Sequence, residues 1–299
     1  MIKTARNAAA SAMAWTLYHA PALEAPYAHA AHAARHVPGL HTLFREATDR
    51  LTVRLVNGRR QCRRVRIGPV APVFDVSGFT VKGQYFSRVP YEPGATGAVL
   101  RFLEPGGVFV DIGANAGYFT ILAALRVGVS GRVYAFEPNP SVRQQLRRHV
   151  DLNAAGTQVT IADVALADRD EDDVKLFVSC WPENDGIASL TPSAETISRG
   201  GLREDATIRV RVQRFDTWAA AARLSRIDLI KIDVEGAEAQ VLHGMADTLD
   251  RIRPRRLIVE TMAGSDAVAL LHARGYRSTV LDEIHGGIPN LLFESRDAA

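Results

Sequence analysis

Residues 108–120 read VFVDIGANAGYFT, and this stretch decides the fold. Its apolar start, bounded by glycine, is typical of a buried central strand in a parallel sheet, and the strand ends near Asp111. Gly113 and Gly117 let the backbone approach a ligand, and the helix that begins at Tyr118 offers free amides. The order Asp-x-Gly-x-x-x-Gly is not the dinucleotide pattern, and an acid at the strand end would repel a pyrophosphate. We therefore expect a strand, loop and helix that bind a ligand with an ammonium group and no phosphate.

A second informative stretch, YAFEPNP at residues 134–140, ends a second strand with Glu137. Glu137 lies 20 residues beyond Gly117, where an acid can accept hydrogen bonds from both hydroxyls of a ribose. Together the two stretches indicate an adenosyl ligand with an amino-acid moiety, which is the chemistry of S-adenosylmethionine. The alternative is a pair of strand ends with solvated carboxylates.

A third stretch, IDLIKIDVEGAE at residues 227–238, places more acids at a strand end. Asp233 ends a strand at the carboxyl edge, where doubly wound sheets bind ligands, and Glu235 follows just beyond it. Lys231 alternates with apolar residues and is expected to reach a carboxylate. A structural lysine–acid pair and a catalytic lysine both fit this pattern.

From residue 99 onward, apolar runs alternate with helical patterns. Further strands are expected at 132–136, 158–161, 228–232 and 257–260, with 291–294 as a final edge strand. Helices are expected at 118–126, 141–152, 237–249 and 266–274. This series predicts an α/β fold with a doubly wound parallel sheet. Residues 179–206, rich in Ser, Gly, Pro and Asp, form a loop-like insertion in this interpretation.

We expect three parts along the chain: an Ala- and His-rich segment at 1–47, a small β-containing subdomain at 48–98, and the main domain at 99–299. In the first part, His29, His32 and His36 have helical spacing, so a solvated helix or a metal cluster would fit, and the solvated helix is favoured. In the second part, Asn57-Gly58 predicts a β-hairpin whose arginines are expected to be solvated.

Composition sets broad limits on the protein class. The chain has 299 residues, 47% of them hydrophobic, which excludes a wholly disordered chain, a coiled coil and a disulfide scaffold. The formal charge is +3, and the two cysteines form no framework, so a cytoplasmic setting is expected. No stretch is apolar enough to span a membrane, and a secretory signal in the Ala-rich start is the less favoured alternative.

The three stretches, with RFDTW at 214–218 and Glu260 at the end of the fifth strand, resemble the FkbM family of S-adenosylmethionine-dependent methyltransferases. The resemblance covers roughly residues 90–293 and departs mildly at Phe215, where the family usually has Leu. It implies the Rossmann-like sheet of class I methyltransferases, with an N-terminal helical and β-hairpin extension. It also implies that Asp111, Gly113 and Gly117 line the methionine end of the cofactor, and that Glu137 binds its ribose.

The adenine contact is expected after the third strand, in the segment ADVALAD at 162–168. Asp163 or a backbone amide near Ala165 could bind the exocyclic amine, or the acids here could be ordinary loop carboxylates. The full expected set for the cofactor is Asp111, Gly113, Ala114, Asn115, Gly117, Glu137, Asp163 and Ala165.

The expected activity is methyl transfer to a hydroxyl of a small molecule or sugar, since family members mostly act on such groups. A hydroxyl is a poor nucleophile at pH 7, so a positioned base is expected. Asp233 is the first choice, followed by Glu235, with Glu260 as the third acid and His285 and His243 as other candidates. Asp233 and Glu235 could instead hold Mg²⁺, although no complete ligand set is visible and no metal is expected. The acceptor is expected to contact Tyr85, Tyr91, Glu92, Trp181, Asn184 and Asp185.

Three other functions are weaker. An RNA methyltransferase would fit the pI near 9.0 and the arginine hairpin, but no RNA module or stacking aromatics are evident, so no nucleic-acid partner is expected. A nicotinamide-dependent oxidoreductase conflicts with the glycine spacing. A non-catalytic binding protein would have no reason to keep Asp111, the two glycines and Glu137.

Overall fold

The computed structural model describes residues 2–20, 62–75, 91–180, 187–192, 201–282 and 288–295, with residue 197 and scattered positions between 23 and 51. Its contacts divide the chain into two units, Met1–Tyr91 and Glu92–Ala299. Among the described helices, none combines the length and the apolar character needed to cross a bilayer.

The first unit contains helix α1 (Ile2–His19) and a short antiparallel pair, β1 (Cys62–Arg64) and β2 (Val73–Asp75). Ala10, Ala14 and Leu17 are buried along one side of α1. The expected Asn57-Gly58 turn and the three spaced histidines lie outside the described residues.

The second unit starts before the expected boundary at residue 98, because helix α5 (Pro93–Phe102) runs across that position and belongs to this unit. The amino end of α5 is hydrogen-bonded to a residue far along the chain. The carboxylate of Asp282 accepts hydrogen bonds from the backbone N–H groups of Gly94, at 2.6 Å, and Ala95, at 2.8 Å.

The second unit is built on a seven-stranded sheet with the order β12-β13-β11-β10-β3-β4-β5. The parallel strands are β3 (Val108–Ile112), β4 (Arg132–Phe136), β5 (Val159–Ala162), β10 (Leu229–Ile232) and β11 (Arg256–Glu260). The chain runs outward from β3 to β5 and returns to β10 on the other side of β3. The carboxyl ends of β3 and β10 therefore flank a topological switch point, where α/β sheets bind ligands.

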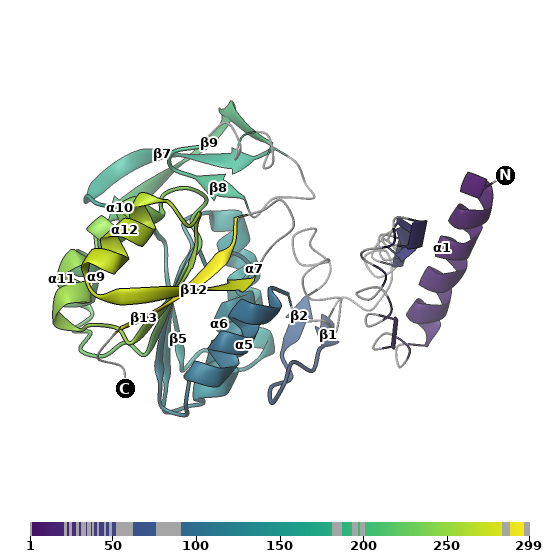
Figure 1. Ribbon diagram of the computed structural model, residues 1–299, viewed down its shortest axis with the longest axis horizontal. Helices are drawn as coiled ribbons and strands as arrows, with labels where there is room; N and C mark the ends of the chain where they lie inside the picture. Colours follow the sequence, from purple (N-terminus) through teal and green to yellow (C-terminus); the bar gives the residue numbers. More distant parts are fainter. Residues whose placement is uncertain are drawn as a thin grey trace. The chain divides into compact units, whose positions relative to one another are not determined.

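Helices cover both faces of this sheet, which is the doubly wound arrangement (Figure 1). One face carries α5, α6 (Tyr118–Val127) and α7 (Pro140–Leu152), and the other carries α9 (Phe215–Ala221), α10 (Glu238–His243), α11 (Ala246–Arg251) and α12 (Asp266–Ala273). The single helix expected at 237–249 is two helices, which meet near Gly244. A β-carbon on Gly244 would lie 1.9 Å from the carbonyl oxygen of Ala167, so the chain passes too close here for any side chain.

The far edge of the sheet differs from expectation. Strand β13 (Asn290–Ser295) is not an edge strand, because it pairs antiparallel with β11 on one side and with β12 (Tyr276–Asp282) on the other. The central sheet is therefore mixed, and β12 forms its edge.

A second, four-stranded sheet has the order β6-β9-β7-β8. It consists of β6 (Val164–Leu166), β7 (Glu171–Ser179), β8 (Ala188–Ser189) and β9 (Leu202–Gln213). The expected loop-like insertion at 179–206 thus contains β8 and the start of β9. Ala165, Leu176 and Val212 form part of a small apolar core of this sheet.

Candidate active site

The loop at residues 113–117 uses its own backbone amides for internal hydrogen bonds. The N–H groups of Gly113 and Ala114 both donate to the carbonyl of Phe136, and that of Gly117 donates to Ala114. The remaining two N–H groups donate to side-chain oxygens, that of Asn115 to Glu137 and that of Ala116 to Asn115. The backbone N–H groups of these five positions are therefore all used within the chain, whereas the expectation of free amides at the start of the helix at Tyr118 stays a prediction. A loop built this way has little to offer a phosphate, in agreement with a phosphate-free ligand.

The two glycines of this loop are required by packing within the chain. Gly113 has φ +80°, and a β-carbon there would lie 1.8 Å from the carbonyl oxygen of Asp233. Gly117 has φ +92°, and its β-carbon would lie 2.3 Å from Cδ1 of Leu146 on α7. Close approach to a ligand stays a prediction, whereas close approach to neighbouring chain segments is a feature of the fold.

Asp111 lies inside the protein, with 1% of its surface exposed. Its Oδ2 accepts a hydrogen bond of 2.5 Å from the Thr120 hydroxyl, and Lys231 stands opposite it on β10. Burial raises the pKa of Asp111 to about 6, although the Thr120 hydrogen bond and the Lys231 charge act in the other direction. The Asp111 carboxylate therefore stabilises the first turn of α6 through its hydrogen bond with Thr120. The expected contact of Asp111 with the methionine end of a cofactor stays a prediction.

Glu137 follows β4 and is held at both of its carboxylate oxygens. Oε2 accepts from the Asn115 N–H at 2.9 Å, and Oε1 accepts from the Asn139 N–H at 2.8 Å. Burial raises its pKa to about 7, while these backbone N–H groups act to lower it. Each carboxylate oxygen can accept a second hydrogen bond. The group is therefore oriented by the backbone and still able to accept from a ligand.

The two residues expected near adenine, Asp163 and Ala165, lie in different environments. Asp163 is exposed after β5 and lies 3.6 Å from a guanidinium nitrogen of Arg211. Ala165 is buried in β6, where it pairs with Val212 of β9. Their contact with adenine stays a prediction.

A cluster of four charged side chains, Lys231, Asp233, Glu92 and Glu260, lies at the carboxyl ends of β10 and β11. The Lys231 ammonium is 2.7 Å from Oδ2 of Asp233 and 3.9 Å from Oε2 of Glu92. The carboxylate oxygens of Glu92, Asp233 and Glu260 lie within 4.8 Å of one another. We call these four residues the acid–lysine cluster.

The ammonium of Lys231 is enclosed, with 2% of the side chain exposed. It lies 4.6 Å from the centre of the Phe119 ring, in a cation–π arrangement. Burial alone would lower the pKa of Lys231, but the charges of Asp233, Glu92 and Glu260 raise it above the ordinary value. Lys231 therefore stays protonated, and the expected lysine–acid pair is present.

Glu92 belongs to the cluster, although the sequence suggested only an acceptor contact for it. It precedes α5, has φ 43°, and accepts a hydrogen bond of 2.9 Å from the Asn290 side-chain amide. Glu92 and Asn290 lie 198 residues apart in the chain, and no local pattern marks either of them. Only the return of β13 to the sheet brings them together.

Glu235 lies in a strained part of the loop that follows β10. Its φ is 53°, in the left-handed region that non-glycine residues rarely adopt. Its carbonyl accepts a hydrogen bond of 2.9 Å from the hydroxyl of Ser189 in β8, which is 1% exposed. This hydrogen bond links the second sheet to the loop after β10, which carries the expected bases Asp233 and Glu235.

Of the two metal ligands considered from sequence, Asp233 and Glu235, the structure places only Asp233 among acids spaced closely enough for a metal. Within the described part of the chain, the acidic residues that lie close enough together to hold a metal ion are Glu92, Asp233 and Glu260. Glu235 is not among them. The ammonium of Lys231 already provides a cation in hydrogen-bond contact with Asp233.

Two histidines were weaker candidates for the base. His243 is exposed at the end of α10, and His285 lies outside the described residues. Of the expected acceptor contacts, Tyr85, Trp181, Asn184 and Asp185 also lie outside them.

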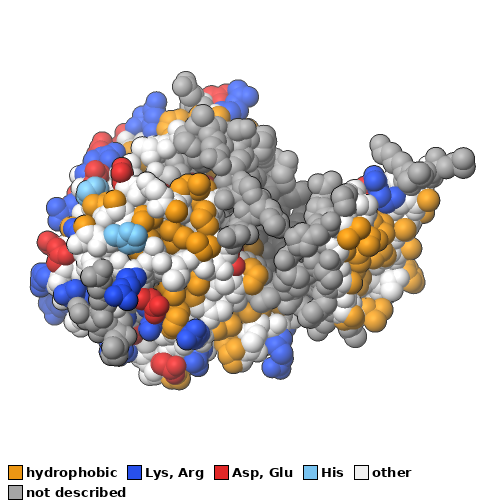
Figure 2. Space-filling model, in the orientation of Figure 1, with side chains coloured by type: hydrophobic (Ala, Val, Ile, Leu, Met, Phe, Trp, Pro, Cys, Tyr) orange, Lys and Arg blue, Asp and Glu red, His pale blue; other side chains and the backbone are white. Residues whose placement is uncertain are grey.

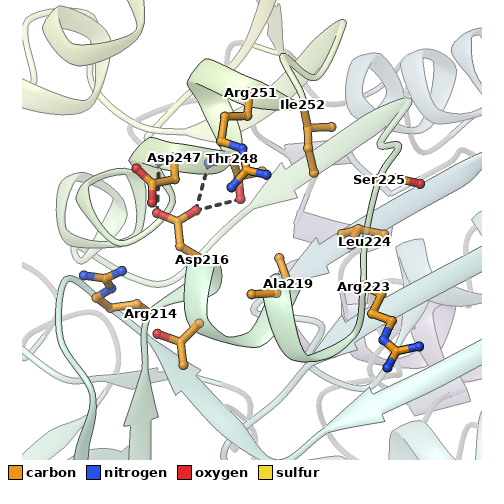
Figure 3. Close-up of a pocket in the computed structure, with 12 residues that line it drawn as sticks. Arg214, Asp216, Ala219, Arg223, Leu224, Ser225, Asp247, Thr248, Arg251 and Ile252 are labelled. Atoms are coloured by element: carbon orange, nitrogen blue, oxygen red, sulfur yellow. Dashed lines mark hydrogen bonds between the residues drawn. The ribbon is translucent and has the colours of Figure 1, made fainter.

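A surface hollow of about 720 Å³ lies away from these residues (Figure 3). Leu224 and Ile252 line it and precede β10 and β11, whereas Asp233 and Glu260 stand at the opposite ends of these strands. In Figure 3, Asp216 accepts hydrogen bonds from two backbone N–H groups and the hydroxyl at the start of α11. The hollow is therefore at the amino edge of the sheet and is not the candidate active site.

The RFDTW stretch has a packing role. Phe215 is fully buried, and the rings of Phe215 and Trp218 lie 5.8 and 4.8 Å from the ring of Phe136 on β4. Asp216 caps α11, as described above. Phe215 and Trp218 in this part of the family resemblance therefore belong to the core, and Asp216 stabilises a helix end.

Comparison with known proteins gives a family match. The model of the methyltransferase FkbM domain matches residues 111–278. Relatives include the AMB antimetabolite synthetase AmbE of Pseudomonas aeruginosa, which is 29% identical over 211 residues, covering 60% of this chain and 10% of AmbE. The 2-O-methyltransferase NoeI of Sinorhizobium fredii is 29% identical over 165 residues, covering 52% of this chain and 64% of NoeI. The 31-O-demethyl-FK506 methyltransferase FkbM of Streptomyces tacrolimicus is 30% identical over 200 residues, covering 58% of this chain and 74% of that protein. The chain thus spans less than two thirds of AmbE and of NoeI.

Proposed function

The chain belongs to the FkbM family of S-adenosylmethionine-dependent methyltransferases, and we propose that it methylates a hydroxyl oxygen of a small molecule or sugar. One observation carries the proposal. Glu137 after β4 and Asp233 after β10 stand on either side of the loop that follows β3, at the switch point of the sheet. Relatives named as a 2-O-methyltransferase and a 31-O-demethyl-FK506 methyltransferase support an oxygen acceptor.

The donor and acceptor groups of the site fit the cofactor. Glu137 offers acceptor positions to two ribose hydroxyls, and its orientation is fixed by two backbone N–H groups. The loop at 113–117 has its own amides satisfied, which suits a ligand without phosphate. The cluster acids outnumber Lys231, and this negative surplus suits a cationic sulfonium nearby.

Bound S-adenosylmethionine supplies a methyl group on a positively charged sulfur. Asp233 has 23% of its side chain exposed, whereas Lys231 and Glu92 have 2% and 3%. We assign it the role of accepting the proton of the acceptor hydroxyl as the new oxygen–carbon bond forms. Lys231 holds Asp233 in place by a hydrogen bond of 2.7 Å.

A nucleic-acid acceptor has less support. Figure 2 shows basic and acidic side chains interspersed over the visible face of the second unit, with no gathering of one sign. RNA-binding surfaces are usually strongly positive over a continuous area.

Calorimetric titration of the purified protein tests the proposal. We expect saturable binding of S-adenosylmethionine and S-adenosylhomocysteine, and no binding of NAD. Glu137→Ala should weaken binding of both sulfur ligands by about 1.5–3 kcal/mol, because charge-assisted hydrogen bonds are lost. Glu104→Ala, which changes an exposed acid on the same unit, is the matched control and should bind normally.

NAD binding without binding of the sulfur ligands would overturn the proposal. If both sulfur ligands bind, methyl transfer to a panel of hydroxylated acceptors is the next measurement. Transfer to nitrogen-containing analogues in preference to their hydroxyl counterparts would contradict the oxygen acceptor.

A further inference from the structure

His149, towards the end of α7, is a polar side chain with none of its surface exposed. Its Nδ1 lies 2.6 Å from the carbonyl oxygen of Ala116, which is 33 residues earlier in the chain and 1% exposed. A carbonyl oxygen can only accept a hydrogen bond, so Nδ1 carries a ring proton and donates it. His149 therefore links the loop at residues 113–117 to α7 by a hydrogen bond that water does not reach.

This hydrogen bond fixes the direction of one peptide group in the loop. Because the N–H groups of the five loop residues are used within the chain, the loop can offer a ligand its carbonyl oxygens. Their directions depend on how each peptide group is rotated, and His149 turns the carbonyl of Ala116 towards α7. The next residue, Gly117, packs against Leu146, which lies one turn before His149 on the same face of α7.

The amino end of the same helix holds Glu137. Asn139 caps α7, since its side chain accepts a hydrogen bond of 3.1 Å from the Ser141 N–H, and its own N–H donates to Oε1 of Glu137 at 2.8 Å. Arg143, in the first turn, donates from Nη1 to the carbonyl of Glu137 at 2.8 Å. One helix therefore contacts Glu137 at its start and the loop at residues 113–117 further along.

We propose that His149 is a positioning residue of the cofactor site. By holding Ala116 against α7, it sets the place of the loop that receives the methionine end relative to Glu137, which receives the ribose. The inference rests on the proposed function, because both of these contacts belong to it. His149 acts through the backbone of the loop, so it matters for ligands that reach from the ribose position to the methionine position.

Two adenosyl ligands make this role measurable. S-Adenosylhomocysteine and 5′-methylthioadenosine share the adenosine and a neutral sulfur, but only the first carries the amino-acid moiety. His149→Leu should weaken binding of S-adenosylhomocysteine by about tenfold, because the loop loses its buried donor, and should change binding of methylthioadenosine by less than about twofold. Calorimetry measures both affinities, with methylthioadenosine followed by its displacement of S-adenosylhomocysteine where its own heat is small.

A conservative variant and a matched control separate positioning from loss of stability. His149→Asn can donate from its side-chain amide near the place of Nδ1, so it should restore most of the affinity for S-adenosylhomocysteine. Asn153→Ala is the control, because it removes a hydrogen bond of 2.8 Å to the backbone carbonyl of His149 on the same helix and leaves the ring contact in place. This control should lower stability and keep the ratio of the two affinities.

Three results with these variants would overturn the positioning role. The first is an equal loss of both ligands in His149→Leu, and the second is the same change of ratio in Asn153→Ala. The third is an affinity in His149→Asn as low as in His149→Leu, which would mean that the donor is unimportant.

The hydrogen bond itself can be observed in the wild type without any ligand. In protein labelled with ¹⁵N-histidine, magnetic resonance should show a proton on Nδ1 of His149 that exchanges slowly with water. The signal is assigned by its loss in His149→Asn. A ring that carries its proton on Nε2 alone would overturn the inference, since Nδ1 could then not donate to Ala116. This result does not depend on whether His149→Leu folds.

The outcomes also separate this inference from the proposed function. Failure of S-adenosylmethionine and S-adenosylhomocysteine to bind the wild type would overturn the proposed function, and the positioning role would fall with it. Binding of both, with the ratio of the two adenosyl affinities unchanged in His149→Leu, would overturn the positioning role and leave the proposed function standing.

Discussion

The α-carbon of Gly113 packs against the carbonyl of Asp233, so closely that a β-carbon on Gly113 would lie 1.8 Å from that oxygen. The loop that follows β3 and the loop that follows β10 therefore meet backbone to backbone. One of these loops leads to the expected cofactor residues, and the other carries the proposed base. The distance between the two loops is therefore set by the absence of a side chain at Gly113.

Gly113→Ala should destabilise the protein by more than about 3 kcal/mol, because it combines a positive φ with a clash against backbone. Gly275→Ala is the matched control, since Gly275 has φ +86° and open space where its β-carbon would be. That variant should lose only about 1 kcal/mol. Denaturant unfolding of both measures the difference, and equal losses would show that the contact with Asp233 is unimportant.

Affinity for S-adenosylmethionine should increase with pH between about pH 6 and 8. The pKa of Glu137 is about 7 in the folded protein, and the ionised carboxylate is the better acceptor for ribose hydroxyls. Calorimetry across this range measures the effect, and Glu137→Ala should lack it. A pH-independent affinity in the wild type would contradict the ribose assignment.

Folding stability should change with pH in the opposite direction. Burial raises the pKa of Glu137 from 4.5 to about 7, so the folded state binds more protons than the unfolded state in this interval. The contribution of Glu137 is therefore present below pH 4.5 and is lost as the pH rises through 7, by up to about 3 kcal/mol. Comparison of unfolding free energies of the wild type and Glu137→Ala at pH 5 and pH 8 isolates this contribution.

Lys231→Met should destabilise the protein by about 3–5 kcal/mol, because it leaves buried carboxylates without their cation. The double variant Lys231→Met with Asp233→Asn should recover part of this loss. Asp233→Asn alone should keep cofactor binding and lose turnover. Additive effects in the double variant would mean that the 2.7 Å contact has no energetic coupling.

Ser189→Ala should loosen the loop after β10, since it leaves the carbonyl of Glu235 without its buried donor, at a cost of about 1–3 kcal/mol. Amide hydrogen exchange of residues 233–237 measures the effect, and Ser130→Ala, at an exposed turn, is the control. Unchanged exchange in Ser189→Ala would mean that the second sheet does not hold this loop.

The strands at the centre of the sheet could be predicted because they are buried on both faces. Val108–Ile112 and Leu229–Ile232 are apolar except for Asp111 and Lys231, and each ends at a recognisable turn. The edge strand Tyr276–Asp282 could not, since it is largely exposed and carries mixed polar residues. The same holds for Glu171–Ser179, whose first three residues are acidic and exposed.

The candidate site was predictable where it follows strand ends. Glu137, Asp233 and Glu260 each stand at the carboxyl end of a strand, and parallel strands bring such ends to one edge. Glu92 and Asn290 could not be placed, because their contact depends on the antiparallel return of β13. The glycine loop was located correctly, but the bonding of its amides depends on Phe136 and Glu137, which the sequence does not place at hydrogen-bond distance.

The self-contained hydrogen bonding of residues 113–117 has a consequence for the thermodynamics of binding. An arriving ligand meets a loop whose conformation the fold has already fixed, so the entropic cost of ordering it falls on folding and not on association. Binding of an adenosyl ligand should therefore show the negative heat capacity change expected for the apolar surface that it covers, without the larger change that accompanies local folding.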